Sequence, residues 1–232
     1  MKRIQNRAIT SYTGPWWPRN VGDVELVSCT LQGCSIGYAH SRSFSRRTIV
    51  ENVIVKDCRI SKCLVGPAQL QDIYLENILG GDLLVWGALF KHVTMKGRFD
   101  GVLIHGKARL EMSGEELRRY WPLCDRFYAD CDWALDISDA EFGDFDIRTR
   151  GVPASLVRRD AETQAVVKAV KIREGLWKRM QLGGLVETAF NLWESGGGED
   201  LIIVAPKRNK TGFAEVMTDI RRLRDAGIAE PD

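Results

Sequence analysis

The chain has 232 residues, of which 44% are hydrophobic, so it can bury a real core and is not expected to be disordered. Its 33 basic and 31 acidic residues leave a net charge of +2, which favours neither a duplex-binding surface nor an acidic mimic of nucleic acid. The N-terminus lacks the apolar core of a secretion signal, and the longest aliphatic stretches are too short and too interrupted to span a membrane. We therefore expect a soluble, cytoplasmic protein.

Residues 1–22 contain the sequence TGPWWPRN, in which prolines flank a pair of tryptophans. Proline cannot donate a hydrogen bond to a strand ladder, so this segment cannot continue a regular strand repeat. An uncovered sheet edge recruits other chains. We predict that residues 1–22 form an N-terminal cap on the structure that follows.

From residue 23 to residue 112 the dominant pattern is a pair of apolar residues, separated by one other residue, that recurs every five positions. The longest block runs without interruption from Val53/Val55 to Val93/Met95, and Gly80 is its one weak member. Neither a helix, which repeats at 3.6 residues, nor a strand, which repeats at 2, explains such a spacing. A coil with short straight sides does explain it, because each pair can point inward while the remaining residues turn a corner.

Four such sides close a coil of about 20 residues, and coils stack at the spacing of neighbouring strands, about 4.8 Å. Four of the six cysteines fall on inward positions of this repeat, where we expect small core residues and neither zinc ligands nor disulfides. These four are Cys29, Cys34, Cys58 and Cys63. The other two lie outside the repeat and are expected to take part in ordinary helix packing.

Residues 113–130, SGEELRRYWPLCDRFYAD, interrupt the repeat. Ser113 and Glu116 have the spacing of a capping box at a helix N-terminus. We predict an inserted helix, or two short ones, with Pro122 breaking or restarting the first. Residues 131–154 return to the five-residue pattern and form the last coil.

The last coil contains SDAEFGDFDIR, and its Ala140-Glu141-Phe142 unit resembles the pentapeptide-repeat proteins. Their usual unit is alanine, Asp or Asn, leucine, and then two variable residues. In the rest of this chain Cys, Val or Ile replaces the alanine, and the outward Asp or Asn is mostly absent. The resemblance covers roughly residues 23–105 and 134–154 and implies a right-handed quadrilateral β-helix. A parallel β-helix with longer rungs is the alternative.

After Gly151 the rhythm stops, and residues 155–232 are predicted to form a small α/β region packed on the β-helix. SLVRRDAETQAVVKAV predicts a β-hairpin that turns at Asp160 to Thr163. LIIVAPK predicts a short buried strand. Helices are expected near residues 174–180 and 184–194, and the last helix, TGFAEVMTDIRRLRDAG, is expected to end at Gly227. The predicted fold class is therefore mainly β, a right-handed parallel β-helix with an inserted helix and a small α/β C-terminal region.

The outward positions supply the first candidate site. Residues 20 apart share a face, so Phe44, Leu64 and Leu84 form an apolar stripe, with Leu89 on the next face. Such a stripe is rarely left in water. Either it is a docking face for another protein, or the inserted helix or the C-terminal region covers it.

An acidic run from Asp125 to Asp146 supplies the second candidate site. Within it Asp136, Glu141 and Asp146 fall on successive sides of the coil, where they could face a partner. Because they point in different directions, they are a poor pair for glycoside chemistry. The repeat and the acidic run show no metal-ligand spacing, and we expect neither a metal nor a cofactor.

No catalytic constellation accompanies the three histidines, since no nucleophile motif lies near them. We therefore expect a non-enzymatic, protein-binding β-solenoid, in particular a bacterial immunity protein that neutralises a toxin, with possible homodimers and with neither nucleic acid nor a membrane as partner. One alternative is a carbohydrate- or acyl-active enzyme that uses a groove on the β-helix, with Asp136, Glu141 or His105. The other, implied by the resemblance, is a DNA mimic that protects topoisomerases, against which the net charge counts.

Overall fold

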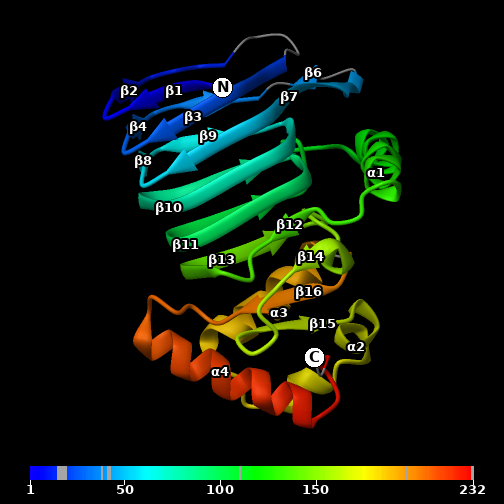
Figure 1. Cartoon of the computed structure of the whole chain (residues 1–232). Coiled ribbons are helices and arrows are strands. Elements are labelled where there is room, and N and C mark those ends of the chain that lie inside the picture. Colours follow the sequence, from blue (N-terminus) through cyan, green and yellow to red (C-terminus); the bar gives the residue numbers. More distant parts are fainter. Residues whose placement is uncertain (15–19, 38, 41–42, 110, 197, 231–232) are drawn as a thin grey trace.

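The computed structural model describes residues 1–14, 20–37, 39–40, 43–109, 111–196 and 198–230, and for residues 39–40 and 43–46 it describes the backbone alone. Strand makes up 44% of the chain and helix 27%, so the fold is mainly β, as the sequence predicts. Figure 1 shows the strands stacked above one another, with helix α1 beside them and the C-terminal helices below. None of the described helices has the length and hydrophobicity to cross a membrane.

Most strands belong to one large sheet in which neighbouring strands run parallel. Gln69 pairs with Ile49 on one side and with Leu89 on the other, so successive stretches of about 20 residues lie in register. We call each such stretch a row. In order, the first rows contain β1 (Lys2–Gln5) and β2 (Ala8–Thr10); β3 (Asn20–Val27), β4 (Thr30–Gln32) and β5 (Ser35–Ile36); β7 (Ser43–Lys56), β8 (Arg59–Ser61) and β9 (Cys63–Val65); β10 (Ala68–Trp86); and β11 (Leu89–His105).

Two insertions lengthen the distance between rows. The first insertion contains β6 (Ala39–His40), which pairs antiparallel with the start of β7. It lengthens the stretch of chain between the second and third rows, so that Asn20 pairs with Ile49. Helix α1 separates β11 from the strands that follow it. The sixth row contains β12 (Leu135–Asp136) and β13 (Ala140–Arg148), and β14 (Val157–Arg158) pairs with β12.

A residue in the left-handed conformation stands between the short sides of the first five rows. Asn52, Asp57 and Lys62 in the third row, and Asp72 and Asn77 in the fourth, have φ of 52° to 53°. Asn and Asp adopt this conformation at lower cost than other residues with a side chain. Each of them directly precedes an inward residue, so the five-residue rhythm is a short extended segment followed by one residue that turns the chain.

Burial confirms the inward positions that the repeat predicts. Ala88, Phe90, Val93 and Met95 are at most 3% exposed. The repeat cysteines also lie inward, three buried and one half-buried, and all six cysteines are free thiols. Gly80, the weak member of the pattern, is exposed.

Helix α1 (Gly114–Ala129) is one continuous helix, so the predicted break at Pro122 is wrong. Ser113 and Glu116 form the predicted capping box. Tyr120 and Tyr128, on either side of the proline, are buried, and their hydroxyls bond to backbone groups near the sheet at 2.7 Å and 3.2 Å. These tertiary contacts outweigh the backbone hydrogen bond that proline cannot make.

The N-terminal segment differs from the predicted cap. β1 and β2 extend the sheet by pairing in parallel with β3 and β4, and Lys2 lies in register with Val24. Ile4 and Ile9, five residues apart, supply the inward side chains of this first row. The segment that contains both tryptophans, residues 15–19, lies outside the described residues.

The C-terminal region packs against the opposite end of the sheet (Figure 1). Val166 of β15 (Gln164–Val167) and Ile202 of β16 (Leu201–Val204) belong to the same buried cluster as the interior of the sheet. The backbone N–H of Arg208 donates to the carbonyl of Phe142 at 3.1 Å. The interior is therefore closed at this end by the chain itself.

The predicted hairpin at Asp160 to Thr163 is wrong. β14, before the turn, stays in the large sheet, and β15, after it, pairs antiparallel with the buried strand β16. Strand β16 provides an all-apolar partner that local propensity cannot reveal. The remaining elements, which include the three predicted C-terminal helices, are η1 (Ala154–Leu156), α2 (Ala169–Glu174), η2 (Leu176–Arg179), α3 (Gly184–Gly196) and α4 (Lys210–Asp225).

Candidate functional site

Three leucines form a column on the outside of the sheet. Leu84 pairs in register with Leu64 on one side and with Leu103 on the other, and we call these three residues the leucine ladder. Leu83 and Val85, which flank Leu84, are 8% and 2% exposed, whereas Leu64 is 38% exposed. This contrast follows from the strand geometry, in which alternate residues face opposite sides. An in-register column of leucines is the kind of surface that marks a contact with another molecule.

The leucine ladder includes two of the three apolar residues predicted for the outward stripe, Leu64 and Leu84. The side chain of Phe44 lies outside the described residues, and the second-row register partner of Leu64 is Ser35. Leu89 is only 4% exposed, because helix α1 packs over this part of the sheet. Of the two alternatives for the outward apolar residues, Leu89 therefore follows the second, because the inserted helix covers it and it is not a docking residue.

An aromatic stack follows the ladder along the same strands. The rings of Trp86 and His105 are nearly parallel, with centroids 4.1 Å apart. Burial, followed by the charges of Lys107 and Arg148, lowers the pKa of His105 to about 4, so its ring is neutral at pH 7.

The hydrogen bonds of His105 fix its tautomer and argue against a catalytic role. Nδ1 accepts from the backbone N–H of Lys107 at 3.2 Å, so the proton of the neutral ring sits on Nε2. Nε2 lies 3.3 Å from the hydroxyl of Thr149 and therefore donates to it. A ring that donates to a hydroxyl cannot at the same time take a proton from it, so Thr149 is not activated as a nucleophile.

The three predicted acidic residues do not converge. Asp136, Glu141 and Asp146 lie in three different columns of the sheet, and Asp146 forms an ion pair with Arg148. Asp144, in the same acidic run, has a pKa that is raised by partial loss of solvation and then by the charge of Asp146, although its side chain remains exposed. Its alternating position in β13 resembles that of any outward residue, so no sequence signal distinguished it.

A polar column runs along one corner of the rows. The imidazole of His92 lies between two carboxylates, with Nε2 2.7 Å from Asp132 and Nδ1 3.1 Å from Asp72. The hydrogen bond with Asp132 is the main reason why the pKa of His92 is raised, and the bond with Asp72 adds to it. His92 has φ of 56°, which places it at a corner, as the repeat predicts.

Three of the buried thiols are in surroundings that disfavour the reactive thiolate form. Burial raises the pKa of Cys58, Cys124 and Cys131, which keeps these thiols protonated at neutral pH. Within the described part of the chain, no group of three or more His, Cys, Asp or Glu residues could hold a metal ion.

The sheet surrounds an apolar cavity of about 540 Å³ that is partly open to solvent and that the repeat does not predict. It extends from the first row to the fifth, where Phe90, Val93 and Met95 form its floor. Its walls are mainly inward aliphatic side chains, among which Val55 and Leu75 are only half-buried, and Leu64 of the leucine ladder also lines it. We call this space the axial cavity.

The volume of the inward side chains explains where the axial cavity lies. The later rows are filled by aromatic rings such as Phe99, Phe142 and Phe145, whose centroids are 4.5 Å to 5.4 Å apart. The earlier rows carry mainly Val, Ile, Leu and Cys at equivalent positions, which fill less of the interior. A vacant apolar space of this volume would cost on the order of 10 kcal/mol, comparable with the whole stability of a domain. Water gains little there because it needs several polar partners.

Comparison of the chain with protein-family models, with curated proteins and with solved structures gave no match.

Proposed function

We propose that this chain is a non-enzymatic binding protein built on a right-handed, four-sided β-helix of the pentapeptide-repeat type. The register of about 20 residues between rows supports this architecture, as does the left-handed residue that recurs every five positions. Stacked rows of this kind make a stiff surface, because each row is hydrogen-bonded to both neighbours. Rigid surfaces bind with little loss of conformational entropy.

The observation that carries the binding proposal is the leucine ladder. Leu64, Leu84 and Leu103 present adjacent aliphatic side chains at the spacing of neighbouring strands. The indole of Trp86 lies on the same strand two residues beyond Leu84 and is half-buried. Asp146 lies in register with Leu103, and its ion-pair partner Arg148 lies in register with His105, so the two residues supply a charged rim. An apolar centre with an aromatic ring and a charged rim is typical of a protein–protein contact.

The partner we propose is another protein, and the narrower form of the proposal is a bacterial toxin that this chain neutralises. The test is capture of partners from native cells by the tagged full-length protein, with identification by mass spectrometry and stoichiometry by light scattering. Leu84→Asp should abolish capture, because it places a charge at the centre of the apolar column. Thr94→Asp, an outward change in the next strand, should leave capture intact.

Capture that is equally strong for the wild type and for Leu84→Asp would refute the ladder as the docking face. Purification of a monomer or homodimer without any stoichiometric partner would refute the protein-binding function itself. The immunity role requires, in addition, that the captured protein arrests growth when it is expressed alone and is harmless when it is expressed with this chain.

A further inference from the structure

We propose that the axial cavity binds the hydrocarbon chain of a free long-chain fatty acid, and that Lys2 holds the carboxylate at the N-terminal end. This inference concerns the inside of the sheet and does not depend on the docking face proposed above. It rests on the shape of the cavity, on the chemistry of its lining and on one charged residue in an inward register position.

The length and lining of the axial cavity suit one extended alkyl chain. The cavity spans the strands β1, β3, β7, β10 and β11, which are successive neighbours in the sheet. Four steps between neighbouring strands, at about 4.8 Å each, give a length of roughly 19 Å. Its volume of about 540 Å³ lies in the range of small-molecule sites. The side chains that face it are almost all hydrocarbon, so they offer no hydrogen bonds to a polar ligand.

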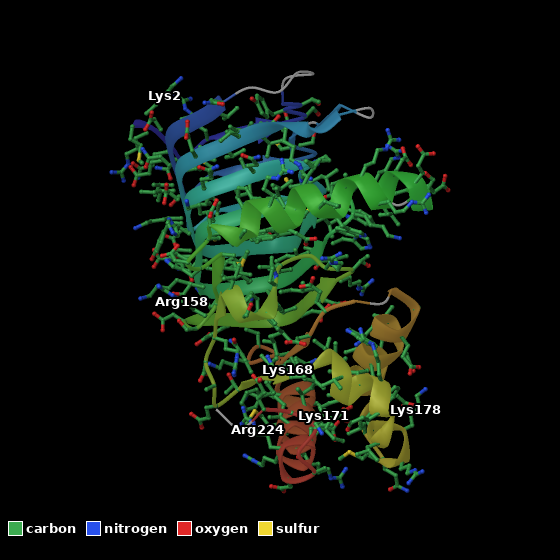
Figure 2. All side chains as sticks on the ribbon, turned by 90° about the vertical axis from the view of Figure 1, so that its right-hand side faces the viewer. Lys2, Arg158, Lys168, Lys171, Lys178 and Arg224 are labelled. Atoms are coloured by element: carbon green, nitrogen blue, oxygen red, sulfur yellow. The ribbon has the colours of Figure 1, made fainter. Side chains whose placement is uncertain are left out.

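Lys2 marks the end at which the head group would lie. It is in register with Val24, and that column continues through Val53, Ile73 and Val93. Rows two to five thus carry Val or Ile, and the sixth row carries Leu135, where the first row carries lysine. Lys2 is exposed, lines the cavity and lies at the N-terminal end of the sheet in Figure 2.

An ammonium group at the mouth of an apolar space complements the carboxylate of a fatty acid. Tyr12, which is 47% exposed, lines the same end and adds a phenol hydroxyl. A second copy of the chain, stacked on the edge of β1 with which no described strand pairs, is the competing occupant. Stacking would bring two inward lysines together, and inward charges at a sheet edge act against such pairing. The charge at Lys2 therefore favours an anionic ligand over a second copy.

The test uses the full-length protein stripped of lipid on a hydrophobic resin and titrated with cis-parinaric acid, a fatty acid whose fluorescence rises in an apolar site. We expect a saturable rise, with competition by palmitate. Val55→Phe fills the cavity and should weaken binding by on the order of tenfold. Ile54→Phe is the matched control, since the neighbouring side chain points outward, and it should change the affinity less than about twofold.

The role of Lys2 is tested with two competitors that differ in the head group alone. Lys2→Met should weaken competition by palmitate about threefold to fivefold, as for an exposed ion pair, and should leave competition by hexadecanol unchanged. Circular dichroism and a cooperative urea transition check that each variant folds, and Leu75→Phe replaces Val55→Phe if that variant does not.

Three results would overturn the proposal. The first is the absence of a saturable signal in the stripped protein. The second is an equal effect of the inward and outward Phe substitutions. The third is a phospholipid, or dimerisation without any lipid, found by mass spectrometry and light scattering of the protein as purified from cells. Equal weakening of palmitate and hexadecanol by Lys2→Met would remove the role of the ammonium group.

Discussion

Two substitutions at equivalent inward positions should differ in cost because one lines the axial cavity and the other lies in a filled interior. Leu75 and Ile104 are each the second member of an inward pair, and truncation to Ala removes three carbons from either one. Ile104 is 1% exposed, and its Cγ2 atom lies against the backbone of Gly151. Leu75 is half-buried and lines the cavity.

Three buried carbons are worth about 2.4 kcal/mol of transfer free energy, at about 0.8 kcal/mol each. At Ile104 the vacated space adds a cavity term, so Ile104→Ala should cost about 3–5 kcal/mol of unfolding free energy. At Leu75 about half of the transfer term applies and little new cavity forms, so Leu75→Ala should cost about 1–2 kcal/mol. For a chain of this length each kcal/mol lowers the Tm by about 2–4 °C.

The assay is urea unfolding of the lipid-stripped proteins, with the midpoint and the slope fitted separately. Unchanged slopes with the larger midpoint shift for Ile104→Ala would support the contrast. If Leu75→Ala costs as much as Ile104→Ala, the early rows are packed as tightly as the late ones, and the reasoning that leads to the axial cavity is refuted.

Three further predictions concern the corners and helix α1. Two carboxylates raise the pKa of His92, so the stabilisation that it provides is complete below the unfolded pKa of about 6.5 and is lost as pH rises through the higher folded pKa. The urea midpoint of the wild type should therefore exceed that of the His92→Gln variant at pH 5.5, and this difference should be smaller at pH 9. Tyr128→Phe leaves a buried backbone N–H of the sheet without its partner and should cost about 1–3 kcal/mol, seen as faster amide exchange in α1. Gly87 and Gly33 share φ of +59°, but an added Cβ at Gly87 would lie 2.4 Å from the Cα of Ala108, whereas an added Cβ at Gly33 would meet nothing. Gly33→Ala should therefore cost about 1–2 kcal/mol of unfolding free energy for the left-handed backbone alone, and Gly87→Ala should cost more. An equal Tm for the two Ala variants would contradict the clash at Gly87.

The repeat allowed much of the sheet to be predicted because its signal is local. Each inward pair is followed by a residue that turns the chain, and this unit recurs without interruption from Val53 to Met95. The start of helix α1 could also be predicted from the local sequence, since Ser113 caps it as the spacing to Glu116 predicts. The first row was missed because Lys2 stands where the pattern requires an apolar residue, although Ile4 and Ile9 keep the correct spacing.

The other errors arise from contacts between distant parts of the chain. Leu89 reads as an outward residue, and only the position of helix α1 explains its burial. The local sequence predicts β15 as the second strand of a hairpin, but β15 pairs with β16, which lies 30 or more residues later in the chain. The axial cavity depends on the summed volume of many inward side chains, which a pattern of apolar and polar letters does not record.

The order of the rows along the chain has a consequence for synthesis. Each row pairs with the one made just before it, so the sheet can grow by one row at a time as the chain leaves the ribosome, at about 5–20 residues per second. The newest strand is always an open edge, and the residues that cover the last edge, from β15 to α4, are made after every strand of the large sheet. A chain halted near residue 154 should therefore expose a template for strand addition, and ribosome-release experiments should find it in aggregates while the full-length chain stays dispersed.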